Sequence, residues 1–195
     1  VSAFLLNRSS DLEIYTWDKI SDQEIGSSAV EITGSTVNGH VFGAGKGEAN
    51  TFECEKTMAR ATTVSISAGT VEKNVYGGGE VGRVDQDSKV TIGVKDAEKG
   101  SAAPVINDNV FGAGAGKDTH GYSALVRGNT EVILQGNAKV GKSVYGSGEI
   151  AAVGRYGLDG SGMPTTLVSG GECKVSVKGD ADIGENVFGA GEGVV

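Results

Sequence analysis

The residues best suited to chemistry are few, and the clearest candidate fails a test of spacing. The run from Gly112 to Lys117, Gly-Ala-Gly-Ala-Gly-Lys, has the composition of a phosphate-binding loop. That loop would need Gly at position 111 and Ser or Thr at position 118, where this chain has Phe111 and Asp118. A dinucleotide site would need a helix after the glycines, and no segment has convincing helical periodicity. We therefore predict no nucleotide and no other cofactor.

Metal and thiol chemistry find no better support. Cys54, Cys173, His40 and His120 contain no C-x-x-C or H-x-x-x-H pair, so we predict no zinc site. The cysteines lie in the first and fifth copies of a repeat described below, which places them about 14 to 19 Å apart at one strand spacing per copy. A disulfide spans less than about 7 Å between Cα atoms, so we expect free thiols.

Acidic residues in two turns are possible calcium ligands. They are Asp85 and Asp87, and the pair Asp159-Gly160. The chain lacks the G-G-x-G-x-D repeat of calcium-binding β-rolls, so we interpret both as solvated turns and expect no bound metal. No nucleophile is paired with a base, and we predict no enzymatic turnover.

The strongest pattern is a five-fold repeat of the phrase Val-[Phe/Tyr]-Gly-x-Gly. An aliphatic residue stands four positions before each copy, at Val37, Val71, Ile106, Val140 and Ile183. Self-similarity at such intervals is typical of chains that stack one supersecondary unit on the next. The invariant motif residues are Val41, Phe42, Gly43 and Gly45; Val75, Tyr76, Gly77 and Gly79; Val110, Phe111, Gly112 and Gly114; Val144, Tyr145, Gly146 and Gly148; and Val187, Phe188, Gly189 and Gly191.

A second strand-like element precedes each motif. We call these the V-x-I elements, since most have Val followed two residues later by Ile, and most alternate apolar and polar residues. They begin 34, 26, 42 and 43 residues apart, at Val30, Val64, Val90, Val132 and Val175. About 26 residues suffice for one rung of a three-sided coil. The longer intervals then indicate surface insertions, which we place at 95–104, 151–171 and 48–61.

The sequence therefore predicts an all-β fold, a parallel β-helix or β-solenoid of about five irregular rungs with inserted loops. The repeats span about 29–61, 62–88, 89–129, 130–172 and 173–195. Residues 1–28, which include Trp17, form an N-terminal cap or a divergent first rung. The alternative is a meander of antiparallel hairpins, which the scarcity of Asn-Gly and Asp-Gly turns disfavours. We interpret the chain as part of a longer polypeptide.

Stacking the copies in register would create columns of equivalent side chains. The residue before each motif valine is short and polar in most copies, and we predict that this column forms a structural ladder. Its members are His40, Asn74, Asn109, Ser143 and Asn186. The aromatic residues of the motif form a second column, which is either an interior stack or an exposed stripe able to bind sugar rings or a partner; we favour the interior stack.

Composition narrows the function. The net charge of −8 disfavours nucleic acid and anionic membranes, and no run approaches the ~20 apolar residues of a transmembrane helix. Gly accounts for 33 of 195 residues, against a usual share of about 7%. Because most of these glycines occupy fixed positions beside Val, Ile and Thr, they indicate ordered β-structure with tight turns.

The motif, preceded by an aliphatic turn and a V-x-I strand, resembles the V-Y-G-G-G and V-F-G-G-G repeat regions of very large, glycine-rich surface or secreted proteins of gut-type anaerobic bacteria. The similarity covers about residues 29–195, although this chain has Ala or Ser between most of the paired glycines. The resemblance implies a parallel β-helix in an extracellular or cell-surface setting and transfers no catalytic residue.

From these observations we expect a non-enzymatic structural or adhesive segment, such as a stalk, adhesin or fibre component. A carbohydrate-binding or carbohydrate-active β-helix is the competing class, and ice binding is a third, for which Thr33, Thr91 and Thr130 give no regular column. The open edge of the last repeat should be covered by further chain or by another subunit docking end to end. Other surface proteins and glycans are the remaining partners we expect.

Overall fold

The computed structural model describes residues 26–47, 57–97, 100–117, 124–158 and 164–193. These residues form β-strands and contain no helix, which confirms the all-β prediction. The strands make two large parallel sheets and one antiparallel hairpin. Because neighbouring strands of both large sheets are parallel, the alternative of an antiparallel meander is wrong. No helix in the described part of the chain is long and apolar enough to cross a membrane.

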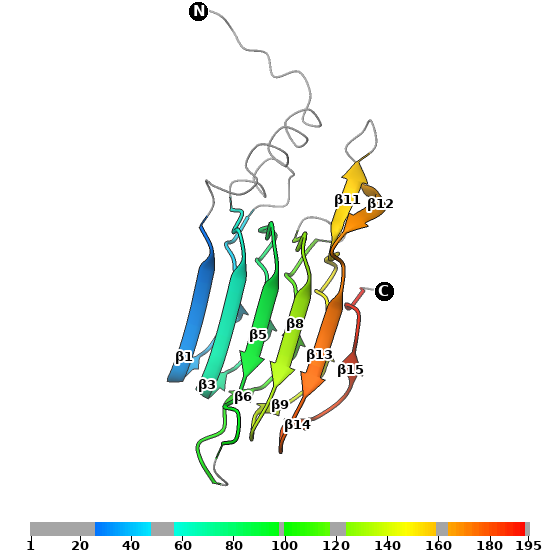
Figure 1. Ribbon diagram of the computed structural model, residues 1–195. Coiled ribbons are helices and arrows are strands. Elements are labelled where there is room, and N and C mark those ends of the chain that lie inside the picture. The colour runs from blue at the N-terminus through cyan, green and yellow to red at the C-terminus, as the bar shows by residue number, and fades with distance from the viewer. Residues whose placement is uncertain (1–25, 48–56, 98–99, 118–123, 159–163, 194–195) are drawn as a thin grey trace, which may run out of the picture.

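Five strands of the first sheet form a series, with one strand from each repeat. These strands lie side by side in chain order, as the blue-to-orange series in Figure 1 shows. The V-x-I elements are in register, with Val64 opposite both Val30 and Val90, and Val132 opposite both Val90 and Val175. The strands are β1 (Ser28–Val37), β3 (Thr62–Val71), β5 (Ser88–Ile92), β8 (Thr130–Leu134) and β13 (Cys173–Val177).

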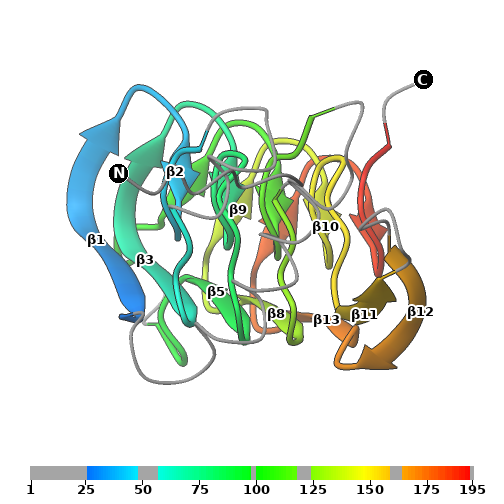
Figure 2. The same ribbon diagram turned by 90° about the horizontal axis from the view of Figure 1, so that it is seen from above.

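This sheet curls, because the two halves of the long strand β3 pair with different strands. The first half of β3 pairs with β5, and its last residues pair with β6 (Val105–Ile106), which continues to β9 (Lys139–Val140) and β14 (Asp182–Ile183). Gly69 lies between the two paired halves of β3, and its φ of 97° is unfavourable for any other residue. Figure 2 shows the resulting curvature from above.

The second sheet contains the glycine motifs themselves. Val110 is paired with Val75 on one side and with Val144 on the other, and the flanking repeats continue the same register. The motif valines are therefore neighbours from repeat to repeat. The strands are β2 (Val41–Phe42), β4 (Val75–Tyr76), β7 (Val110–Phe111), β10 (Val144–Tyr145) and β15 (Val187–Phe188).

The main core is built from the aliphatic side chains of both sheets. The first four motif valines belong to one buried cluster with most of the aliphatic residues of the V-x-I elements and of the position four residues before the motif, including Val64, Ile66, Ile106 and Val110. Period-two alternation accounts for this, since β3, β5 and β8 bury every second residue.

Two additional columns of bridges extend each repeat beyond the predicted strands. Lys46, Glu80, Ala115, Glu149 and Glu192 pair in series, and so do Ala59, Val84, Val126 and Val153. Val84, Val126 and Val153 form a second core with Ala113. Two predicted insertions, 48–61 and 151–171, were therefore drawn too wide, because Ala59 and Val153 belong to the stacked structure. Within the second of them, β11 (Arg155–Leu158) and β12 (Pro164–Ser169) form the antiparallel hairpin.

Candidate functional site

The polar column before the motif is a continuous ladder of side-chain-to-backbone hydrogen bonds. The Asn109 N–H donates to Asn74 Oδ1 (3.0 Å), and the Ser143 N–H donates to Asn109 Oδ1 (2.9 Å). The Asn74 N–H donates to His40 Nδ1 and the Asn186 N–H donates to Ser143 Oγ, both at 3.3 Å. Each acceptor holds the next repeat, so His40 occupies a structural position in the ladder.

The aromatic column is a stack of parallel rings. Neighbouring ring centroids lie 4.7–4.9 Å apart, with interplanar angles of 4–14°. This separation matches the spacing of parallel strands, about 4.8 Å. The rings are Phe42, Tyr76, Phe111, Tyr145 and Phe188.

Valines and aromatics point to opposite sides of the second sheet, as strand alternation requires, yet both are buried in the middle repeats. Tyr76, Phe111 and Tyr145 form a cluster of their own, with Phe42 and Ala115 packed against it, separate from the aliphatic core. The burial of these rings agrees with the interior stack that the sequence favoured over an exposed stripe. In the terminal repeat, by contrast, Val187 and Phe188 are 48% and 43% exposed.

The hydroxyl groups of the stacked tyrosines meet carboxylates. Tyr76 Oη donates a hydrogen bond to Glu149 and accepts one from Asn74 Nδ2 at 2.7 Å. Burial, together with the bond to Glu149, raises the pKa of Tyr76 far above its usual value near 10. Burial and the nearby Glu192 carboxylate also raise the pKa of Tyr145. These phenols therefore stay neutral and act as hydrogen-bond donors, which suits a structural role.

The raised pKa of Tyr76 predicts a loss of stability in alkali. A tyrosine in the unfolded chain loses its proton near pH 10, whereas folded Tyr76 retains it, so the free energy of unfolding should fall as the pH rises through 10. Tyr76→Phe should flatten this fall, because phenylalanine has no hydroxyl proton to lose. Phe fits at this position, since it fills the same place in three other repeats. Urea unfolding of both proteins between about pH 9 and pH 11 measures the slopes. Equal slopes would contradict the assignment.

A second polar ladder lies at the start of the first sheet, and we did not predict it. The Asn129 N–H donates to Asp87 Oδ1 (2.8 Å), and the Glu172 N–H donates to Asn129 Oδ1 (3.0 Å). The signal was available in the sequence, since an acid or Asn immediately precedes Ser88, Thr130 and Cys173. The turn containing Asp87 is thus ordered by a hydrogen bond across repeats.

Hydroxyl groups at the first position of three strands of the first sheet, β1, β5 and β8, form another unpredicted set. Ser88 Oγ donates to the Gly112 carbonyl at 2.8 Å, and Thr130 Oγ1 donates to the Gly146 carbonyl at 2.5 Å. Ser28 makes the same bond to Gly43 (2.5 Å). These bonds join the start of a repeat to its own glycine motif. Cys173 stands at this position in the last repeat as a free thiol.

Asp85 corrects our interpretation of the acidic turns. Its side chain is 4% exposed and pairs with Arg127 Nη1 of the next repeat at 2.6 Å, so it is not a solvated turn residue. Arg83, beside it in the chain, is completely buried. An ion pair removed from water in this way needs good geometry to offset the desolvation of its charges. Its position between two stacked repeats suggests that it fixes their register.

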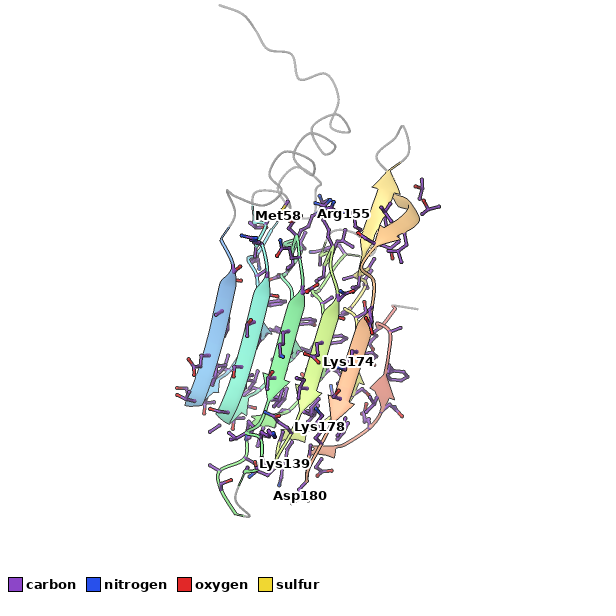
Figure 3. The ribbon with its side chains drawn as sticks, in the orientation of Figure 1. Met58, Lys139, Arg155, Lys174, Lys178 and Asp180 are labelled. Carbon is purple, nitrogen blue, oxygen red and sulfur yellow. The ribbon has the colours of Figure 1, made fainter. Side chains whose placement is uncertain are left out.

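Two of the surface hollows formed by described residues are lined by several charged side chains. One, of about 280 Å³, lies over β5, β8 and β13 and is lined by Asp87, Lys89, Glu131 and Lys174 among others. Glu131 bridges Lys89 (3.0 Å) and Lys174 (3.1 Å), and these ammonium groups lower the pKa of its carboxyl. Figure 3 labels Lys174 on this face. The other, of about 400 Å³, lies at the opposite end of the strands and includes Lys95, Gln135, Lys178 and Asp180.

The lysines of the first hollow are already engaged in ion pairs. Lys89 and Lys174 are both paired with Glu131, and the described residues contain no group of three or more His, Cys, Asp or Glu placed to hold a metal ion. Cys54, His120, Trp17 and Asp159-Gly160 lie outside the described residues, as do residues 1–25 of the expected cap. Comparisons with protein-family models, with curated proteins and with solved structures found no match.

Proposed function

We propose that this chain is a β-solenoid segment with a structural role, a stalk, adhesin or fibre component of a bacterial surface or secreted protein. One observation carries the proposal: the side chains capable of chemistry are used to join one repeat to the next. Asn74, Asn109 and Ser143 accept hydrogen bonds from backbone amides of the following repeat, and Asp87 does the same in the first sheet. An enzyme would instead leave such groups converging on an open space.

The constancy of the stack beside variable insertions supports the same role. Repeats that begin 26 and 43 residues apart keep identical registers in both sheets. The additional residues lie outside the stack, as in the β11–β12 hairpin that projects at one end in Figure 1. Such an arrangement presents variable surface on a constant core, which fits adhesion. The resemblance of the motif to bacterial surface repeats supports an extracellular location.

A carbohydrate-binding function is the second candidate, favoured by the hollow over β5, β8 and β13. Lys89 and Lys174 lie there on either side of Glu131 and could meet the carboxylates of an acidic glycan. The aromatic column lends this candidate little support, because Tyr76 and Phe111 are 2% and 0% exposed and cannot stack on sugar rings.

A screen of acidic and neutral polysaccharides tests both candidates. We expect no depolymerisation, measured as new reducing ends or unsaturated products, and no binding that depends on the hollow. Binding to an acidic glycan that Lys89→Ala and Lys174→Ala abolish, while Lys178→Ala retains it, would support the second candidate. Depolymerisation that Glu131→Gln removes would show that the structural proposal is wrong.

A further inference from the structure

We propose that copies of this chain stack head to tail, the last repeat of one copy docking on the first repeat of the next. This proposal rests on the solenoid architecture proposed above. Within the described residues, β13 and β14 end the first sheet and β15 ends the second, while β1 and β2 lie at the opposite edges. The two edges are complementary in backbone, side-chain and charged groups.

The backbone donors at the C-terminal edge are those that bind the following repeat elsewhere in the chain. The N–H groups of Val41, Val75, Val110 and Val144 each donate to the next repeat, at 2.9–3.0 Å, and those of Gly43, Gly77, Gly112 and Gly146 do so at 2.8–3.0 Å. Val187 in β15 and Gly189 directly after it hold the equivalent positions, and the described structure has no strand beyond β15. Such an edge is a template for another strand.

The N-terminal edge supplies the matching acceptors. The carbonyls that receive the valine N–H groups belong to Asn74, Asn109, Ser143 and Asn186, and His40 is the equivalent residue in the first repeat. In a head-to-tail pair, the Val187 N–H would donate to the His40 carbonyl of the next copy. Asn186 Oδ1 would in turn accept the His40 N–H and extend the polar ladder across the junction.

Charge complementarity selects a second copy as the occupant. In the column that follows the motif, Lys46 stands at the N-terminal edge and pairs with Glu80 of the next repeat at 2.9 Å, and Glu192 stands at the C-terminal edge. The junction would place Glu192 of one copy beside Lys46 of the next, at the spacing of neighbouring repeats. An opposite-charge pair at directly facing positions of neighbouring strands is favourable.

The C-terminal edge also has room and exposed apolar surface for another repeat. A Cβ on Gly43, Gly77, Gly112 or Gly146 would clash with the carbonyl of the following motif glycine, whereas a Cβ on Gly189 would meet nothing within 4 Å. Val177, Val187 and Phe188 are 44%, 48% and 43% exposed there. Docking would bury them as their equivalents are buried inside the chain. A head-to-tail pair still has a free N-terminal edge on one copy and a free C-terminal edge on the other. Further copies would therefore add at both ends and form a fibre.

Zero-length cross-linking tests the junction directly. Chains labelled with ¹⁴N and ¹⁵N are mixed, and a carbodiimide joins Lys side chains to adjacent carboxylates for mass spectrometry. We expect a Lys46–Glu192 cross-link between light and heavy chains, because within one chain these residues lie four repeats apart, about 19 Å. The Lys46–Glu80 cross-link, formed within a chain, is the internal control. Finding the control without the Lys46–Glu192 product would overturn the proposal.

Sedimentation of two variants identifies the edge. Val187→Pro removes the N–H that would cross the junction, and proline is tolerated on edge strands, whereas the control Val187→Ala keeps the N–H. We expect wild-type and Val187→Ala chains to associate with increasing concentration and Val187→Pro to sediment as a monomer with an unchanged circular dichroism spectrum. A wild-type monomer at every soluble concentration, or association of Val187→Pro equal to wild type, would overturn the proposal.

These readouts separate the two proposals. A monomeric chain that turns over no glycan would exclude head-to-tail stacking and leave the structural role in place. A missing Lys46–Glu80 control cross-link would contradict the stacked architecture, and the head-to-tail proposal would fall with it.

Discussion

Replacing Val110 with Asp should destabilise the protein by about 3 to 5 kcal/mol, since it removes a fully buried aliphatic side chain and puts a carboxylate in its place. Val110 is 0% exposed and lies in the main core between Val75 and Val144, with no charged residue in that cluster. Burial favours the protonated acid, so the penalty should shrink as the pH falls toward 4. Urea unfolding at neutral and acidic pH measures both effects.

Val187→Asp is the matched control. Val187 is the last member of the same column, but it is 48% exposed, so its carboxylate would remain hydrated. We expect a change within about 1 kcal/mol when the protein is dilute enough to be monomeric. A similar loss of stability in both variants would mean that burial between neighbouring repeats does not determine the cost of a carboxylate in this column.

The register of the repeats could be predicted because two independent signals agree. The aliphatic residue four positions before each motif and the V-x-I element upstream both recur whatever the interval between repeats. Each therefore marks a buried position, and a period of two settles which residues face the core. The pairing of Val64 with Val90 and of Val110 with Val144 follows from aligning the copies.

The bridges that close each repeat were not predictable in the same way. Ala59, Val84, Val126 and Val153 pair in series, but each follows a segment of different length and has no motif of its own. A short apolar residue after a variable loop is indistinguishable from any other in the sequence. The period-two argument says nothing about what covers the far side of a strand, so it left the aromatic column open between an interior stack and an exposed stripe. The burial of Tyr76 and Phe111 agrees with the interior stack that we favoured.

The buried ion pair was missed because its partners are distant in the chain. Asp85 and Arg127 lie 42 residues apart and meet only because their repeats are neighbours in the stack. Asp85 and Arg127 each follow a member of the Val84–Val126 bridge by one residue, so aligning them would have required that bridge, which was itself unpredicted. The polar ladder, in contrast, is anchored directly to the motif valine, so its members aligned as soon as the motif was found.

Alanine should have different effects at two motif glycines, Gly112 and Gly189, because a following repeat lies against Gly112 and none lies against Gly189 in the described structure. A Cβ on Gly112 would lie nearer to the Gly146 carbonyl oxygen than the 3.0 Å limit that real Cβ atoms respect, and that oxygen is backbone. The two repeats would have to move apart, at the expense of the 3.0 Å bond from the Gly112 N–H to the Tyr145 carbonyl. We expect Gly112→Ala to lower the free energy of unfolding by about 1 to 3 kcal/mol.

Gly189→Ala should have the opposite sign. Its added Cβ meets no atom within 4 Å, and neither glycine has a positive φ, so alanine is allowed at both positions. With no clash, the remaining effect is the smaller conformational freedom of the unfolded chain, which should stabilise Gly189→Ala by about 0.4 to 1 kcal/mol. Urea unfolding of the two variants beside wild type, at monomeric concentrations, gives the comparison. Equal effects at both positions would show that the glycines are required by local backbone geometry and not by the close approach of the next repeat.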